Sequence, residues 1–129
     1  MRDTGLWHPR LAALVAAMGH TDTIVIADAG LPVPPGVESV HLGVARGVPT
    51  FLPVLAAVTA DLVVEEATVA EELSDADILA GLHAGLAGIP VKTTSHDDLK
   101  AACRSACAVV RTGEATPFAN VILRAGVPF

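Results

Sequence analysis

Five polar side chains in this sequence have the chemistry to bind a small polar ligand or to move a proton. They are His20, Asp28, His96, Lys100 and Asn120. Histidine titrates near neutral pH, so a histidine in a cleft can exchange protons with a substrate. Asp28 and Asn120 can bond the hydroxyl groups of a polyhydroxylated ligand. No serine or cysteine lies beside a plausible base, so covalent catalysis is not indicated. The side chains predict a proton-transfer enzyme or a protein that binds a small polar ligand.

His20 and Asp28 flank a short apolar run, residues 23–27, which is rich in β-branched side chains. The run is too short for a helix and predicts a strand that is buried on both faces. Prolines and glycines in residues 30–36 then end the regular structure. Open α/β sheets bind ligands at the carboxyl ends of parallel strands, where Asp28 would lie. The alternative is that Asp28 caps the following turn and that His20 caps the preceding helix.

The rest of the chain predicts helices that alternate with strands. Helices are expected at residues 9–18, 51–60, 75–88 and 96–107, and strands at 23–27, 37–42, 62–70, 89–93, 109–111 and 120–125. Thr50 is expected to cap the second helix. The acidic residues in and after the third strand, Glu65, Glu66, Glu71 and Glu72, are expected to form a solvated edge. The alternation predicts an α/β fold, a single layered domain over residues 1–129 with a mostly parallel sheet flanked by helices.

Cys103 and Cys107 are the only cysteines and stand four residues apart. Both fall on the fourth predicted helix, where a disulfide between them has poor geometry. Without histidines at ligand spacing they make a weak zinc site. We therefore expect small buried side chains and predict no metal ion.

Composition excludes several functional classes. The formal net charge is -6 and there is no run of lysine or arginine, which argues against nucleic acid as a partner. No apolar stretch approaches the roughly 20 residues that a membrane span needs, and residues 1–5 do not resemble a signal peptide. We therefore expect a cytoplasmic protein without membrane contact. No glycine-rich phosphate loop is present, so no nucleotide cofactor is predicted.

Longer motifs, in the same order along almost the whole chain, resemble the D-ribose pyranase family. They are residues 18–23 (MGHTDT), 28–34 (DAGLPVP), 47–51 (GVPTF), 93–96 (TTSH), 111–114 (RTGE) and 120–127 (NVILRAGV). L-fucose mutarotase is related and has a similar Gly-His segment, but its sequence continues differently after the aspartate. The Asp-Ala-Gly-Leu-Pro form found here favours the ribose branch.

The resemblance implies an isomerase that interconverts the pyranose and furanose forms of D-ribose without metal, nucleotide or redox chemistry. The catalytic histidine of the family falls on His20. Its sugar-binding residues fall on Asp28, His96 and Lys100, and its Tyr-Ala-Asn stretch falls on Phe118, Ala119 and Asn120. The resemblance also implies a ring-shaped homo-oligomer, a decamer of two pentamers, with the sugar site at a subunit boundary.

The chain departs from the family pattern in two places. Phe118 replaces the tyrosine, so one hydroxyl is missing from the predicted site. The segment 74–89 is shorter than in familiar members, which trims a peripheral helix. The first departure leaves alternatives open: a non-catalytic sugar-binding or regulatory subunit, a scaffold with a vestigial cleft, or a mutarotase for another monosaccharide such as fucose.

Overall fold

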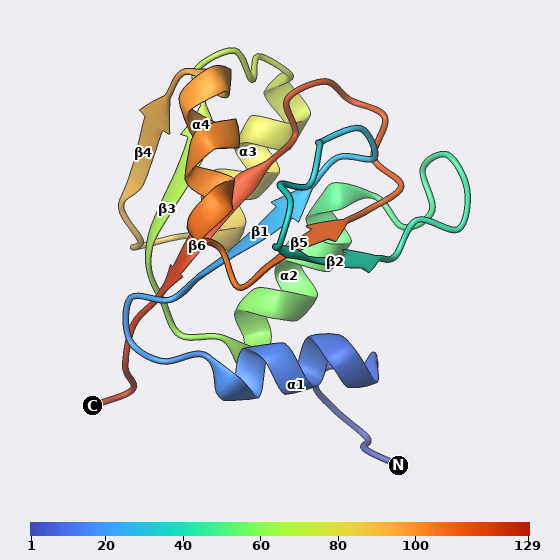
Figure 1. Cartoon of the computed structure of the whole chain (residues 1–129), viewed down its shortest axis with the longest axis vertical. Helices are drawn as coiled ribbons and strands as arrows, with labels where there is room; N and C mark the ends of the chain where they lie inside the picture. The colour runs from blue at the N-terminus through green and yellow to red at the C-terminus, as the bar shows by residue number, and fades with distance from the viewer.

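The structure is a computed structural model that describes residues 1–129 and contains one six-stranded sheet between helices (Figure 1). The helices are α1 (Pro9–Ala17), α2 (Phe51–Asp61), α3 (Ala76–Gly85) and α4 (His96–Ala102), which continues into a 3-10 turn at Cys103–Ser105. The strands are β1 (Thr23–Ala27), β2 (Glu38–His41), β3 (Val64–Ala70), β4 (Val91–Thr94), β5 (Ala108–Arg111) and β6 (Val121–Ala125). None of the helices has the length and apolar character needed to cross a membrane.

The strand order is β2-β5-β1-β6-β3-β4, so β1 lies in the interior of the sheet. It pairs in parallel with β5, as β2 does with β5 and β3 with β4. Strand β6 is the exception, because it runs antiparallel to both β1 and β3. The predicted α/β fold with a mostly parallel sheet is therefore confirmed. Residues Ile24 to Ala27 are fully buried, as expected of a strand covered on both faces.

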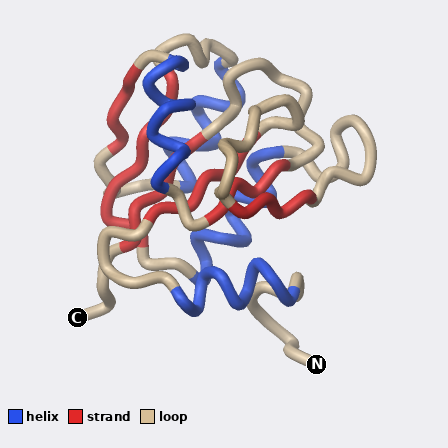
Figure 2. The backbone as a smooth tube through the Cα atoms, in the orientation of Figure 1, coloured by secondary structure: helices blue, strands red, loops and turns tan.

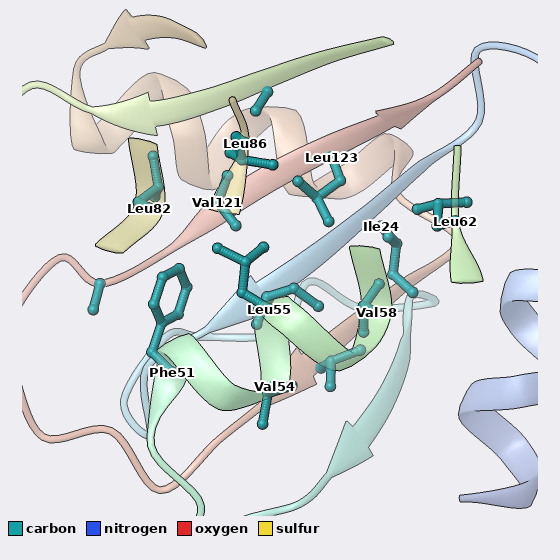
Figure 3. Close-up of a cluster of buried hydrophobic side chains, with 14 of the residues drawn as sticks. Ile24, Phe51, Val54, Leu55, Val58, Leu62, Leu82, Leu86, Val121 and Leu123 are labelled. Atoms are coloured by element: carbon teal, nitrogen blue, oxygen red, sulfur yellow. The ribbon is translucent and has the colours of Figure 1, made fainter. Parts of the chain in front are cut away.

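Two apolar clusters hold helices against the two faces of the sheet. The larger joins α2 and α3 to β1 and β6 through Phe51, Leu55, Leu82, Ile24 and Leu123 (Figure 3). The smaller lies under α4, on the face that is turned toward the viewer in Figure 1, and includes Leu99 and Cys103. Both clusters are mainly aliphatic, and together they fix the orientation of β1.

The predicted helix over residues 96–107 is too long. Helix α4 ends at Ala102, and the chain turns so that the Cys107 N–H donates to the Thr23 carbonyl at 2.8 Å. This bond extends the pairing of β1 with β5, which a continued helix would prevent. The two cysteines therefore do not share a helix, and both are free thiols. Cys103 is fully buried, as expected, whereas Cys107 is only partly buried, and burial raises the pKa of both thiols.

The cap of α2 is also different from the one predicted. Thr50 occupies the N-cap position but makes no side-chain hydrogen bond there. Instead, Oε1 of the buried Glu114 accepts from the Phe51 N–H at 3.1 Å, and Oε2 accepts from Thr116 Oγ1 at 2.9 Å. Burial opposes ionisation of Glu114, but these hydrogen bonds prevail and hold the pKa of its carboxyl below the usual value. Glu114 is therefore a charged cap supplied by a distant segment.

Glu114→Gln should lower the free energy of unfolding by about 1–3 kcal/mol. Both carboxylate oxygens of Glu114 accept hydrogen bonds, and glutamine replaces one of them with an NH2 group, which is itself a donor. The folded-state pKa of Glu114 is depressed, so its stabilising effect is complete above the unfolded pKa, near 4.5, and is lost as pH falls through the folded value. The free energy of unfolding of the variant should therefore fall less than that of the wild type as the pH is lowered. Urea unfolding between pH 3.5 and 7 measures both effects. Glu71→Gln, at an exposed residue, is the control, and equal losses in the two variants would contradict the assignment.

Candidate active site

Asp28 and Asn120 meet at the carboxyl end of β1. The Asp28 N–H donates to Asn120 Oδ1 at 2.8 Å, and Asn120 Nδ2 donates to Asp28 Oδ2 at 3.3 Å. The other carboxylate oxygen of Asp28 accepts from the Gly30 N–H at 2.9 Å. Asn120 is fully buried, whereas Asp28 is partly exposed. The amide thus fixes the carboxylate in an orientation from which it can accept bonds from a ligand.

His96 and Phe118 lie against each other beside this end of the sheet. Their ring centroids are 4.9 Å apart with an interplanar angle of 76°, an edge-to-face contact. The backbone N–H of His96 donates to both carboxylate oxygens of Glu72 at 3.0 Å, which fixes the first turn of α4. Nδ1 of His96 is buried and has no hydrogen-bond partner. Because a buried N–H without an acceptor is costly, we expect the proton on Nε2, from which His96 can donate to a ligand.

Phe118, Ala119 and Asn120 form a tight turn that leads into β6. Phe118 has a φ of 63°, in the left-handed region that non-glycine residues seldom adopt. The turn is closed by a hydrogen bond of 2.8 Å from the Asn120 N–H to the Phe118 carbonyl. Strained backbone of this kind often occurs at functional sites. Here the turn brings the ring of Phe118 to His96 and the amide of Asn120 to Asp28.

Lys100 lies one turn along α4 from His96 and pairs with Asp97 at 3.1 Å. It lines a cavity of about 430 Å³ opposite the proline-rich loop at residues 32–35. None of the four main cavities of the chain is lined by His20, Asp28 or His96. None of these four cavities therefore brings the three side chains together around one sugar.

His20 lies in the segment before β1. Its ring is half exposed, and Nε2 lies 2.9 Å from Oε2 of Glu65, at the start of β3. The next residue, Thr21, has a φ of 72° and donates its N–H to the Ala125 carbonyl at 2.9 Å. Thr21 and Phe118 are the two non-glycine residues with positive φ. Phe118 is itself a predicted site residue, and Thr21 directly follows another, His20.

The predicted residues fall into two groups at opposite ends of the sheet. His20 precedes β1 and lies beside the last residue of β6, whereas Asp28 follows β1 and Asn120 precedes β6. In Figures 1 and 2 the loops after β1 and before β6 lie together, at the end of the sheet far from the C-terminus. Strand β1 alone spans about 13 Å at about 3.3 Å per residue. One ribose cannot contact His20 and Asp28 of the same chain.

Sequence patterns did not indicate that two carboxylates of the acidic edge bond to the site histidines. Glu72 is exposed, as expected of a solvated edge, and Glu65 is partly buried. Glu65 pairs with His20 and Arg124, and Glu72 accepts the N–H of His96. The bonding partners of Glu65 and Glu72 each lie more than twenty residues away in the sequence. The cluster of acidic residues was therefore the only local pattern that could have pointed to these contacts. No group of three or more His, Cys, Asp or Glu side chains is placed to hold a metal ion.

The chain is similar over its full length to curated bacterial proteins. It is 47% identical to a D-ribose pyranase from Coprothermobacter proteolyticus and 48% identical to one from Symbiobacterium thermophilum, with all of each chain covered. Among solved structures, RbsD of Bacillus subtilis complexed with D-ribose has 40% identity and a TM-score of 0.96, and both chains are covered completely.

More distant structures share the fold alone. The fucose mutarotase of Streptococcus pneumoniae, in complex with L-fucose, has 23% identity and a TM-score of 0.80, with 96% of this chain and 100% of that chain covered. The model of the RbsD / FucU transport protein family matches residues 1–128. This match and the full-length relatives show that the chain belongs to the RbsD / FucU family.

Proposed function

We propose that this protein is a D-ribose pyranase, an isomerase that interconverts the β-pyranose and β-furanose forms of D-ribose. The observation that carries the proposal is the full-length likeness to the ribose-bound Bacillus subtilis protein, at 40% identity and a TM-score of 0.96. The curated relatives named D-ribose pyranase support it independently. The side chains His20, Asp28 and His96 supply the polar groups that such a reaction needs.

Ring opening removes a proton from the anomeric hydroxyl as the bond between C1 and the ring oxygen breaks, and a proton is delivered to that oxygen. Reclosure reverses these steps through a different hydroxyl, so no proton is consumed. In our proposal His20 accepts and returns the proton, because an imidazole can act in both directions near neutral pH. The reaction proceeds slowly in water, so acid–base catalysis and positioning are sufficient.

We assign sugar binding to the residues at the other end of the sheet. Asp28 accepts from sugar hydroxyls, His96 donates from Nε2, and Lys100 donates from its ammonium group. The ring of Phe118 packs against the apolar face of the sugar, and the turn at Ala119 and Asn120 holds Phe118 and Asp28 in position. No step requires a cofactor or a metal ion.

Since one chain separates His20 from Asp28, we propose that each site combines His20 of one subunit with Asp28 and His96 of a neighbour. A heterologous contact of this kind generates a closed ring when the rotation between neighbouring subunits closes on itself. A ring-shaped homo-oligomer, with a decamer of two pentamers as the specific prediction, meets this requirement. The cytoplasmic location and the single sugar-binding domain over residues 1–129 remain predictions from the sequence.

Saturation-transfer NMR tests the function directly, because it measures the exchange between the ring forms of ribose in the presence of the protein. We expect accelerated pyranose–furanose exchange for D-ribose and less acceleration for L-fucose. Isothermal titration with ribose is run in parallel. Ribose binding without acceleration would establish the sugar-binding alternative, and acceleration for fucose alone would make the protein a mutarotase of another sugar.

Phe118→Tyr should improve catalysis modestly. The tyrosine ring can keep the contact with His96, and its hydroxyl can add one hydrogen bond to the sugar. A neutral hydrogen bond contributes about 0.5–1.5 kcal/mol, which corresponds to at most roughly a tenfold gain in rate or affinity. The exchange rates of wild type and variant, measured at several ribose concentrations, give the size of the gain.

The same comparison separates two roles for the missing hydroxyl. If it only binds sugar, the wild-type protein is a working enzyme that the substitution improves. An inert wild type made active by Phe118→Tyr would mean that the hydroxyl relays protons, and would show that this chain is a binding protein. Phe51→Tyr is unsuitable as a control because Phe51 is fully buried, whereas Phe129→Tyr adds a hydroxyl to an exposed ring that is not part of the contact between Phe118 and His96.

A further inference from the structure

The carboxylate of Glu65 is the one charged group bonded to the ring of His20. The distance from Nε2 to Oε2 is 2.9 Å, and the two side chains are 52% and 30% exposed. We infer that Glu65 is a positioning residue for catalysis: it holds the His20 proton on Nε2 and leaves Nδ1 to exchange a proton with the sugar. The inference rests on the proposed function for its catalytic consequence, but the hydrogen bond itself can be tested separately.

The backbone around Glu65 is shaped to present this carboxylate. The pairing of β3 with β6 shifts register between Val64 and Glu66, so Glu65 is the extra residue of a β-bulge. Successive side chains of a regular strand point to opposite faces, but a bulge redirects one of them. As a result, Glu65 and Glu66 both reach Arg124, at 2.8 Å and 3.3 Å.

Gly126 provides the room that this arrangement needs. A Cβ atom at Gly126 would lie 3.1 Å from the Cβ of Glu65, which is a crowded contact. The Gly126 N–H also donates to the Val63 carbonyl at 2.9 Å, which ties the end of β6 to the bulge. Thus both strands contribute to the position of the Glu65 carboxylate.

The charges around Glu65 keep it ionised. The hydrogen bond with His20, opposed by partial burial and reinforced by Arg124, holds the pKa of the Glu65 carboxyl below its usual value. Arg124 is in turn shared with Glu66, whose carboxylate also pairs with Lys92 at 2.9 Å. Asp22, the other acid near His20 in sequence, is bonded to the Gly19 N–H instead.

An ionised carboxylate can only accept hydrogen bonds, and this restricts the tautomer of a neutral histidine. Nε2 must carry the hydrogen that Glu65 accepts, so the lone pair is on Nδ1. When Nδ1 takes a proton from the anomeric hydroxyl, the ring becomes an imidazolium that the adjacent carboxylate stabilises. Glu65 therefore orients the ring of His20, selects its reactive nitrogen and stabilises the imidazolium that forms during the reaction.

The test is Glu65→Gln, because glutamine keeps the shape but can either donate to or accept from Nε2. Nitrogen-15 NMR of the imidazole should show the Nε2–H tautomer of His20 in the wild type and a loss of that preference in the variant. We expect the maximal exchange rate to fall roughly tenfold to a hundredfold, by analogy with carboxylates that orient metal-bound histidines. Ribose affinity should stay unchanged.

Glu66→Gln is the matched control, since Glu66 shares Arg124 and Lys92 with this network but does not contact His20. It should leave the His20 tautomer and the exchange rate unchanged. In a His20→Ala background, Glu65→Gln should have no further effect on the rate, because its action passes through the ring. Glu65→Asp, which keeps the charge, should retain more activity than Glu65→Gln.

Three results would overturn the inference. They are a Nδ1–H tautomer in the wild type, a Glu65→Gln variant with unchanged tautomer and rate, and an equal effect of Glu65→Gln with and without His20. Failure of the proposed function gives a different result. The wild type would then not accelerate ribose exchange, while the nitrogen-15 spectra would still report whether Glu65 fixes the tautomer.

Discussion

His20→Ala should abolish most of the acceleration of ribose exchange, by roughly 10²–10⁴-fold, the usual contribution of a positioned acid–base group. The variant should fold normally, because the His20 ring is half exposed and its recorded hydrogen bond is to a partly exposed carboxylate. Saturation-transfer NMR gives the exchange rate, and circular dichroism and thermal unfolding verify the fold. Ribose affinity should change less than the rate, since His20 acts on the reacting proton.

His83→Ala is the control for this experiment. His83 is exposed on α3 and is not a proposed site residue, so its loss should leave the exchange rate unaltered. A folded His20→Ala protein that exchanges ribose at nearly the wild-type rate would remove His20 from the mechanism. The reactive proton would then have to pass through His96, the other histidine of the proposed site.

Elements with strong local signals are predictable from the sequence. The strand predicted at residues 23–27 has the observed bounds, because its β-branched run is too short for any other element. The first helix is also predicted to within one residue, since Pro9 suits a first helical turn and Leu11 and Leu14 mark a buried face. In these segments the signal and the structure depend on the same few neighbouring residues.

Features that depend on distant partners are not predictable in this way. The end of α4 is decided by the bond from Cys107 to Thr23, and the cap of α2 comes from Glu114, 63 residues beyond Phe51. A local pattern contains no information about either contact. It therefore favours the longer helix and the nearer capping residue, Thr50.

The same limit applies to the site. The types and positions of His20 and Asp28 indicate their chemistry, because they flank a buried strand. Their partners are not evident: Asn120 lies 92 residues from Asp28, and Glu65 lies 45 residues from His20. The flanking positions do, however, imply that the two side chains are a full strand apart. This separation is the reason that we propose a site completed by a second subunit.

Two variants that are each nearly inactive should therefore restore activity when mixed. His20→Ala lacks the proton-transfer group but keeps Asp28, whereas Asp28→Ala lacks the carboxylate but keeps His20. If neighbouring subunits share each site, random reassembly of equal amounts should place both intact residues in about a quarter of the sites. Exchange at low ribose concentration should recover to about a quarter of the wild-type rate.

The experiment is carried out by dissociating the two variants, mixing them and reassembling them, with mass spectrometry used to verify that mixed oligomers form. The control mixes His20→Ala with the double variant His20→Ala/Asp28→Ala, which provides no intact His20 and should recover nothing. Mixed oligomers without recovered activity would contradict a shared site. So would a monomer, identified by light scattering, that retains full activity, because in one chain β1 keeps His20 and Asp28 too far apart to act on one sugar.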